Sequence, residues 1–195
     1  MSPPNRESRG RLDGSRVAIL ATHGFEAVEL YRPLEALREA GADTSIVSIA
    51  RSADRIRGWE GGDWGDELDV DGTVDDLSAD DFDALVLPGG VMNPDKLRMD
   101  ERAVAFVRGF FAAGKPVAAI CHAPWMLVEA GVANGRTLTS YPSLRTDLQN
   151  AGARWVDEEV VVDAGLVTSR SPDDLDAFVD KMLEEIQEGV HTPQT

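Results

Sequence analysis

The stretch KPVAAICHAPW, residues 115–125, is a short apolar run that stops at a cysteine, a histidine and a proline. A continuous apolar run of this length is typical of a buried β-strand, because helices need more residues. The segment HAPWMLVEAG (residues 122–131) has apolar residues at helical spacing and ends on a glycine, which is a helix stop signal. We therefore expect a buried strand that turns directly into a helix at Cys121.

The same alternation runs along most of the chain. Strands are expected within residues 16–24, 44–50, 82–90 and 115–120, helices within 26–41, 101–115, 122–131 and 173–189, a strand end and helix within 137–152, and a β-hairpin with Ala-Gly at its tip over 158–170. This order predicts an α/β fold, a flavodoxin-like three-layer α/β/α sandwich with a mostly parallel central sheet. The polar segment 57–81 predicts a small β-ribbon, because ELDVDGTV alternates.

Length and composition describe one globular domain. The chain has 195 residues, of which 43% are hydrophobic and 28% are charged. We expect a single domain over residues 16–188, with a mobile N-terminal tail over residues 1–15 and a C-terminal tail over residues 189–195.

Charge, hydropathy and cysteine content limit which partners and which cellular compartment we expect. The 19 Lys and Arg stand against 35 Asp and Glu, a formal net charge of -16, so we expect no nucleic-acid partner. No segment approaches the roughly 18 consecutive apolar residues of a membrane span, so we expect no membrane partner. A single cysteine cannot form an internal disulfide, and we therefore expect the cytoplasm.

Cys121 stands at the carboxyl end of an expected parallel strand, where ligands bind in such sheets. Ala119 and Ala123, two positions before and after it, fit the close backbone crossing of a nucleophile elbow. The free N–H groups of the following helix would face the sulfur, which predicts a lowered thiol pKa and a reactive thiolate. The alternative is a buried cysteine that only fills space.

Three further polar residues are candidates for proton transfer. His122 is the base nearest to the cysteine, although it reaches the sulfur only if the turn is not helical, and otherwise it caps a helix. Glu26 and Glu29 share one side of the expected helix after the first strand, where they either complement the helix dipole or exchange protons. Apolar neighbours single out Glu29, because desolvation raises the pKa of a carboxyl group.

Gly89 and Gly90 end a buried strand, so their N–H groups either face a developing oxyanion or simply form a turn. No metal-ligand spacing such as C-x-x-C or H-E-x-x-H occurs, and no nucleotide-binding glycine loop is present. We therefore expect neither a metal nor another cofactor.

Five stretches together resemble the PfpI (intracellular protease I) branch of the DJ/PfpI superfamily, which is class I glutamine amidotransferase-like. They are FEAVEL, FDALVLPGG, KPVAAICHAP, TSYPSLRTDLQNAGA, and WVDEEVVVD with the following LVTSR. The resemblance runs from about residue 16 to residue 186, nearly the whole expected domain. The resemblance implies a flavodoxin-like sandwich that assembles as a homo-oligomer, with a reactive cysteine at an elbow.

The resemblance also implies roles for single residues. These are the nucleophile (Cys121), the adjacent histidine (His122), the acid that hydrogen-bonds the sulfur (Glu29), an oxyanion donor (Gly90) and a pocket tyrosine (Tyr141). In protease members a neighbouring subunit supplies a third triad group, and Asp95 occupies roughly that place, with Asp for the usual Glu.

Proteins of this family resemble enzymes of several kinds. We expect a cytoplasmic stress-response protein whose Cys121 attacks small carbonyls or their protein adducts, a glyoxalase/deglycase-type hydrolase. One alternative is an intracellular cysteine peptidase assembled across subunits, with peptides as substrates. Another is a non-enzymatic oxidation sensor or chaperone.

Overall fold

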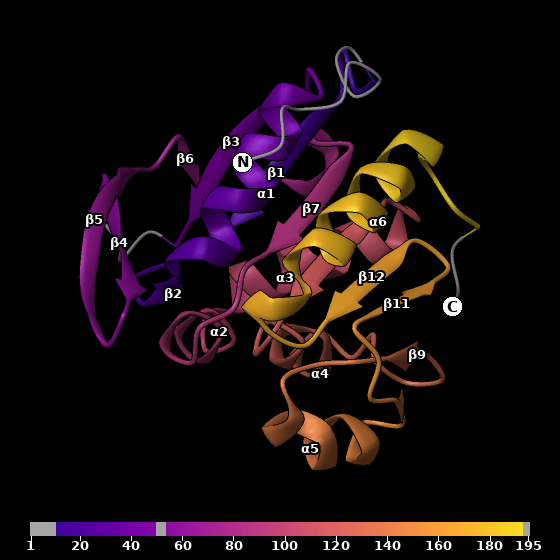
Figure 1. Ribbon diagram of the computed structural model, residues 1–195. Helices are drawn as coiled ribbons and strands as arrows, with labels where there is room; N and C mark the ends of the chain where they lie inside the picture. The colour runs from indigo at the N-terminus through magenta and orange to yellow at the C-terminus, as the bar shows by residue number, and fades with distance from the viewer. Residues whose placement is uncertain (1–10, 50–53, 193–195) are drawn as a thin grey trace.

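The computed structural model describes residues 11–49 and 54–192, and a seven-stranded sheet forms the centre of this part of the chain (Figure 1). From edge to edge its strands are β11 (Val160–Asp163), β12 (Leu166–Ser169), β8 (Val117–Ile120), β7 (Ala84–Leu87), β1 (Arg16–Leu20), β3 (Asp43–Ser48) and β6 (Gly72–Thr73). Neighbouring strands are parallel except in the β11–β12 hairpin, which turns at Ala164 and Gly165. The predicted mostly parallel sheet and the predicted hairpin are confirmed.

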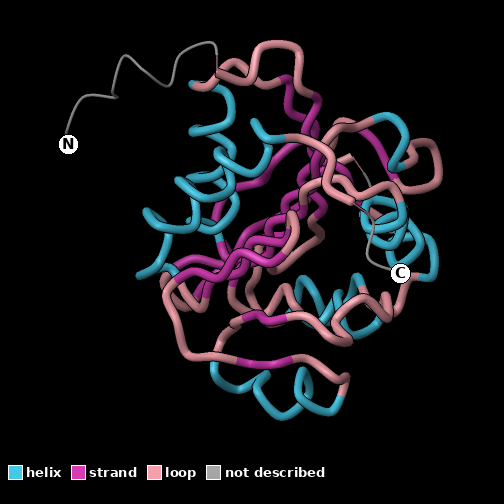
Figure 2. Tube along the Cα trace, turned by 90° about the vertical axis from the view of Figure 1, so that its right-hand side faces the viewer, coloured by secondary structure: helices cyan, strands magenta, loops and turns pink. Residues whose placement is uncertain are grey.

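Helices lie on both sides of this sheet, as the ribbon and the turned view show (Figures 1 and 2). The α-helices are α1 (Ala27–Glu39), α2 (Met92–Leu97), α3 (Glu101–Ala112), α4 (Trp125–Glu129), α5 (Arg145–Asn150) and α6 (Leu175–Glu188). Short 3-10 turns are η2 (Ala79–Asp81), η3 (Pro142–Leu144) and η4 (Pro172–Asp174). Within the described residues no helix is both long enough and apolar enough to cross a membrane.

Alternate residues of each central strand pack into two separate cores. In β7, Leu85 and Leu87 pack with residues of α3 and α4, whereas Ala84 and Val86 pack with residues of α1 and α6. Successive side chains of a strand point to opposite faces, so the two cores are the two covered faces of one sheet. The three-layer sandwich predicted from the sequence is confirmed.

The predicted β-ribbon is part of a second, three-stranded sheet. Its strands are β2 (Phe25–Glu26), β4 (Arg55–Glu60) and β5 (Asp63–Asp69). The β4–β5 hairpin turns at Gly61 and Gly62, whose positive φ angles of 60° and 90° glycine adopts readily. The end of the alternating segment ELDVDGTV does not belong to this second sheet. It forms β6, which pairs with β3 at the edge of the central sheet. A separate parallel pair is formed by β9 (Thr137–Leu138) and β10 (Arg154–Trp155).

Two helices near the strand ends differ from the prediction. The helix expected from residue 122 begins only at Trp125 and has five residues, because the chain before it forms turns in which an N–H bonds to the carbonyl three residues back, as Trp125 does to His122. The short helix α2 follows Gly90 in a segment for which no helix was predicted. Pro94 lies in its first turn, where a missing N–H costs nothing.

Parts of both predicted tails belong to the packed domain. Leu12 is 2% exposed and its N–H donates to the Ala40 carbonyl at 2.8 Å, so this residue packs on the domain. His191 N–H donates to the Gly114 carbonyl at 2.8 Å, which attaches the segment after α6 as well. The remaining parts of the predicted tails, residues 1–10 and 193–195, lie outside the described residues.

Candidate active site

Cys121 follows β8 directly and forms a sharp turn at the carboxyl edge of the central sheet. Its φ of 64° is a value that residues with a side chain adopt rarely and at a cost in energy. The Cys121 N–H donates to the Ser169 carbonyl at 3.0 Å, which attaches the turn to the end of β12. Ala119 and Ala123 are buried on either side. The backbone therefore has the shape of the predicted nucleophile elbow.

The turn brings His122 back onto the cysteine. Its Nδ1 lies 3.2 Å from Cys121 Sγ, and its ring stacks on Tyr141 with 4.6 Å between ring centroids. Tyr141 is itself held in place, because its N–H donates to the Cys121 carbonyl at 2.8 Å. Burial lowers the pKa of His122, so the ring is neutral at neutral pH and one nitrogen is free to accept a proton.

The other ring nitrogen of His122 meets a residue that the sequence did not single out. Ser143 Oγ, in η3, lies 3.3 Å from His122 Nε2. When Nδ1 accepts from the thiol, Nε2 carries the ring proton and donates it to the hydroxyl. Ser143 therefore helps to orient the ring, and its hydroxyl can accept from Nε2 in the tautomer that proton acceptance at Nδ1 requires.

Asp95 stands apart from this group within the chain. It lies in α2, its side chain is about half exposed, and its carboxylate pairs with Arg98 at 3.3 Å. Among the described residues, no hydrogen bond or ion pair joins Asp95 to His122. A contribution of Asp95 to a neighbouring subunit's site stays a prediction.

Glu29 is fully buried in the first turn of α1, beside the sulfur of Cys121. One carboxyl oxygen, Oε2, accepts from the Gly89 N–H at 2.9 Å, and the other, Oε1, has no hydrogen-bond partner among the described residues. Burial, together with the nearby charge of Glu26, raises the pKa of Glu29 to about 8. The carboxyl group is therefore mostly protonated at neutral pH and can donate toward the sulfur.

The thiol of Cys121 is a weaker acid than the sequence predicts. Burial raises its pKa well above the ordinary 9.0, and the charge of Glu29 raises it further. The prediction of a lowered pKa is wrong because the residue is only 7% exposed, and the effect of burial outweighs that of the main-chain N–H groups near the sulfur. Cys121 therefore rests as a thiol, and its proton must leave as it reacts.

Main-chain N–H groups partly offset this rise. Those of Gly90 and His122 lower the pKa of Cys121, which means that they stabilise negative charge at this point. Gly90 has a φ of 78°, and a Cβ there would lie 2.5 Å from the Gly24 carbonyl oxygen, so only glycine fits. Gly90 is thus placed to act as the predicted oxyanion donor. The N–H of His122 is a second donor that the sequence did not identify.

Asn93 holds the strand ends around the site together. It is fully buried, its Oδ1 accepts from the Thr22 N–H at 2.7 Å, and its Nδ2 donates to the Pro88 and Gly89 carbonyls at 2.9 and 3.2 Å. These bonds join the end of β1 to the end of β7. Asn93 lies in the short helix α2, and a single asparagine without a recurring spacing does not indicate such a role from sequence alone.

The site opens into a pocket of about 440 Å³. Glu26 and Tyr141 line it as predicted residues, together with Trp59 of β4 and Met92 of α2. Burial and the charge of Glu60 raise the pKa of Glu26. Among the described residues, the His, Cys, Asp and Glu side chains that are grouped closely enough to hold a metal lie at the end of α6 and not in this pocket.

The chain matches the DJ-1/PfpI family over residues 15–185. It belongs to this family. General stress protein 18 of Bacillus subtilis is 43% identical over 166 residues, which are 85% of this chain and 94% of that protein. A Pyrococcus furiosus protein named Deglycase PfpI is 43% identical over 169 residues, 87% of this chain and 98% of that protein. The predicted resemblance to the PfpI branch is confirmed.

A crystal structure shows the same DJ-1/PfpI fold. It is that of a two-domain protein of Anabaena variabilis with DJ-1/ThiJ/PfpI-like and ferritin-like domains, 36% identical, with a TM-score of 0.82. The match covers 88% of this chain and 48% of the two-domain protein, so this chain spans about half of that protein's length.

In this DJ-1/PfpI chain the fold brings most of the predicted site residues to one pocket. Those gathered there are Cys121, His122, Glu29, Glu26, Gly90 and Tyr141. Gly89 does not line the pocket, and its N–H is not free for an oxyanion because it donates to Glu29. Asp95 is the other exception, and Ser143 and Asn93 are additions.

Proposed function

We propose that this DJ-1/PfpI chain is a cysteine-dependent hydrolase of the glyoxalase/deglycase type, acting on small carbonyl compounds or their protein adducts. One observation carries the proposal: the Cys121 sulfur faces a pocket, with the neutral His122 ring 3.2 Å away and the buried Glu29 carboxyl beside it. The names of two relatives, a deglycase and a general stress protein, support it.

The protonation states define the first step. Cys121 holds its proton at neutral pH, so Nδ1 of His122 takes this proton while the sulfur attacks an aldehyde carbon. A carbon–sulfur bond forms and the carbonyl π bond breaks. The new oxyanion faces the N–H groups of Gly90 and His122, and the imidazolium then returns the proton to it. The product of this step is a hemithioacetal.

Glu29 supplies the second proton transfer. A carboxyl group with a pKa of about 8 gains and loses a proton readily near neutral pH. With methylglyoxal as substrate, the proton on the carbon that bears sulfur moves to the neighbouring carbonyl carbon through an enediol, which gives a thioester. Water then cleaves the thioester and releases lactate and the free thiol. Methylglyoxal plus water gives lactate, so no oxidant is needed.

The proposal also places the protein in the cytoplasm and makes it a homo-oligomer. A single cysteine leaves no internal disulfide, which supports the cytoplasm. In a homo-oligomer, Asp95 of one subunit would face the site of another and add peptidase activity. Peptide cleavage is therefore expected in the oligomer alone.

The test compares wild-type protein with Cys121→Ser, using methylglyoxal as substrate and proton NMR as the readout. Lactate should form with the wild type and fall to background with Cys121→Ser. A matched control is Glu35→Gln, which alters an exposed glutamate on α1 and should keep full activity. Lactate is measured because thiols and amines remove methylglyoxal reversibly without catalysis.

Wild-type protein that forms no lactate from methylglyoxal or from its thiol adducts would overturn the proposal. Cleavage of a fluorogenic peptide by the same preparation would then favour the peptidase. Selective oxidation of Cys121 by mild peroxide, with neither activity present, would favour the oxidation sensor.

A further inference from the structure

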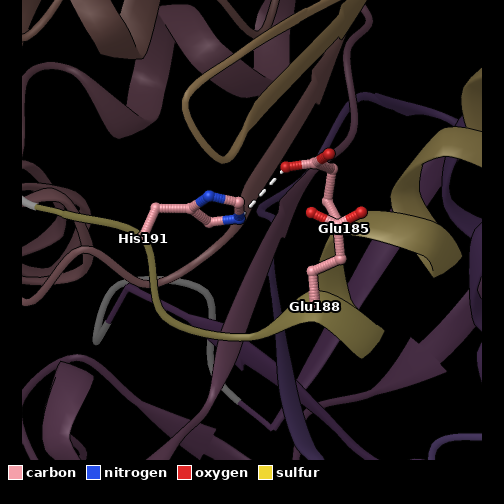
Figure 3. Close-up of side chains that lie close together, drawn as sticks. All are labelled: Glu185, Glu188 and His191. Atoms are coloured by element: carbon pink, nitrogen blue, oxygen red, sulfur yellow. Dashed lines mark ion pairs between the residues drawn. The ribbon is translucent and has the colours of Figure 1, made fainter.

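Two carboxylates and an imidazole meet at the end of α6, away from the pocket of Cys121. Glu185 and Glu188 lie one turn apart on α6, and His191 follows in the segment after the helix. Figure 3 shows the two carboxylates next to one another, facing the His191 ring. One ligand atom from each of the three side chains lies within 4.8 Å of the others.

Two of these atoms are buried and lack a hydrogen bond. Glu185 is 7% exposed, and its Oε2 lies 3.1 Å from His191 Nε2. At this distance the carboxylate attracts the ring when the ring is protonated, but the angles at the two atoms are unsuitable for a hydrogen bond. Neither atom has a hydrogen bond with any other described residue. A buried carboxylate oxygen without such a partner is costly, so a ligand that satisfies it is stabilising.

The position of the histidine ring is fixed in advance. The His191 N–H donates to the Gly114 carbonyl at 2.8 Å. The ring lies against Gly165, where an added Cβ would come within 2.7 Å of ring atom Cδ2. His191 therefore presents its Nε2 to Glu185 without having to be ordered by a ligand.

We infer that Glu185, Glu188 and His191 bind a zinc ion, with water completing the coordination. One imidazole and two carboxylates suit zinc, whereas magnesium and calcium prefer oxygen ligands alone. Two ligands on a tetrahedral zinc ion lie about 3.4 Å apart, close to the 3.1 Å between Glu185 Oε2 and His191 Nε2, so Glu188 must move in by up to about 1.4 Å. The exposed Glu188 side chain can do this by rotation. The chain's formal charge of -16 further favours a cation.

This zinc site lies near the amino ends of strands β8 and β12, whereas Cys121 lies at their carboxyl ends. Gly165 precedes β12, and its carbonyl accepts from the Val117 N–H at the start of β8, whereas Cys121 follows the end of β8. A zinc ion would link the end of α6 to the segment that packs on the β11–β12 turn. Its effect is therefore on stability and not on catalysis.

The sequence prediction of no metal site rested on familiar spacings. Glu-x-x-Glu-x-x-His was not among them, and its last ligand lies beyond the end of the helix. The ligands meet because Gly189, with a φ of 81°, turns the chain back after α6.

The test titrates zinc chloride into protein freed of metal by EDTA and gel filtration. All proteins carry Cys121→Ser, so that the thiol cannot compete for zinc. We expect one saturable site per chain by calorimetry and a Tm that rises with zinc concentration. Glu188→Gln and His191→Gln should each weaken binding by more than about 100-fold, since even the loss of an outer partner of a ligand costs about 10- to 100-fold.

The matched control is Glu184→Gln on the same helix. Glu184 pairs with Lys181 at 2.6 Å, and its loss should leave zinc binding unchanged. The inference is overturned by three outcomes: no saturable zinc binding, binding that survives both Glu188→Gln and His191→Gln, or an equal Tm rise with magnesium chloride. If His191→Gln lowers the Tm of the metal-free protein while zinc has no effect on the protein with the intact site, His191 and Glu185 form only an ion pair and the inference is overturned.

Discussion

Cys121 Sγ and His122 Nδ1 lie 3.2 Å apart although the two residues are neighbours in the chain. On a helix, consecutive side chains point about 100° apart, and on a strand they point to opposite faces. The positive φ of Cys121 removes both restrictions. The costly backbone conformation of the elbow is therefore what turns two adjacent residues into an acid–base pair.

The role of the Cys121–His122 pair is tested by replacing His122, the base, and Ser143, which hydrogen-bonds to it. His122→Gln should lower kcat/KM for methylglyoxal by about 10²- to 10⁴-fold, the usual contribution of a general base. Ser143→Ala should lower it by only about fivefold, since a neutral hydrogen bond contributes about 1 kcal/mol. Ser143→Thr keeps the hydroxyl and should retain activity. The pH profile of kcat/KM should shift in Ser143→Ala, and an unshifted profile would show that Ser143 does not position His122.

Cys121 should titrate as a weak acid. Its thiolate absorbance in the ultraviolet should appear above pH 9.0, because burial and Glu29 both raise the thiol pKa. Glu29→Gln removes the neighbouring charge and should move this titration to lower pH, whereas Glu35→Gln should leave it unchanged. A wild-type thiol that ionises below neutral pH would contradict the protonation states on which the first catalytic step rests.

Stability should fall as the pH rises through the range in which Glu29 ionises. The pKa of Glu29 rises from 4.5 to about 8 on folding, so between these values the folded chain holds a proton that the unfolded chain has lost. The free energy of unfolding should therefore decrease with pH across this window, by up to about 5 kcal/mol, and level off above it.

Glu29→Gln is neutral at every pH and should abolish this decrease. Denaturant unfolding of both proteins between pH 4 and pH 9 measures the difference, which should grow toward the alkaline end. Parallel curves for the two proteins would mean that Glu29 is already ionised in the folded state.

The fold was predictable because strands buried on both faces appear as continuous apolar runs. Residues 82–90 and 115–120 show this plainly, and both became neighbouring central strands. Short elements were not predictable, because contacts distant in sequence decide where they begin. The start of α4, for example, depends on the turn at Cys121, which the Ser169 carbonyl holds.

The location of the site was predictable for a related reason. Parallel strands end at the same edge of a sheet, so polar residues after Leu20, Leu87 and Ile120 had to lie close together. The thiol pKa was not predictable, because burial of the sulfur depends on packing that no local pattern reveals. Ser143 and Asn93 were missed because each is a single polar residue in a short helical turn, η3 or α2, and a single polar residue carries no periodicity.

Gly89, like Gly90, should not tolerate a side chain. Its backbone donates to Glu29, and a methyl group added there would lie 2.5 Å from Glu29 Oε2, 2.7 Å from Cys121 Cβ and 2.8 Å from the Ile120 carbonyl oxygen. Cys121 Cβ and the Ile120 carbonyl oxygen are fixed by the backbone and cannot move away, so Gly89→Ala should destabilise the fold by about 1–3 kcal/mol through overpacking. It should also abolish lactate formation, because Glu29 and Cys121 are pushed apart.

The control is Gly65→Ala in β5, where an added Cβ meets its nearest neighbour at an ordinary 3.6 Å. Denaturant unfolding and the lactate assay should leave this control near wild type, and equal losses in both variants would show that crowding at Gly89 is not the cause.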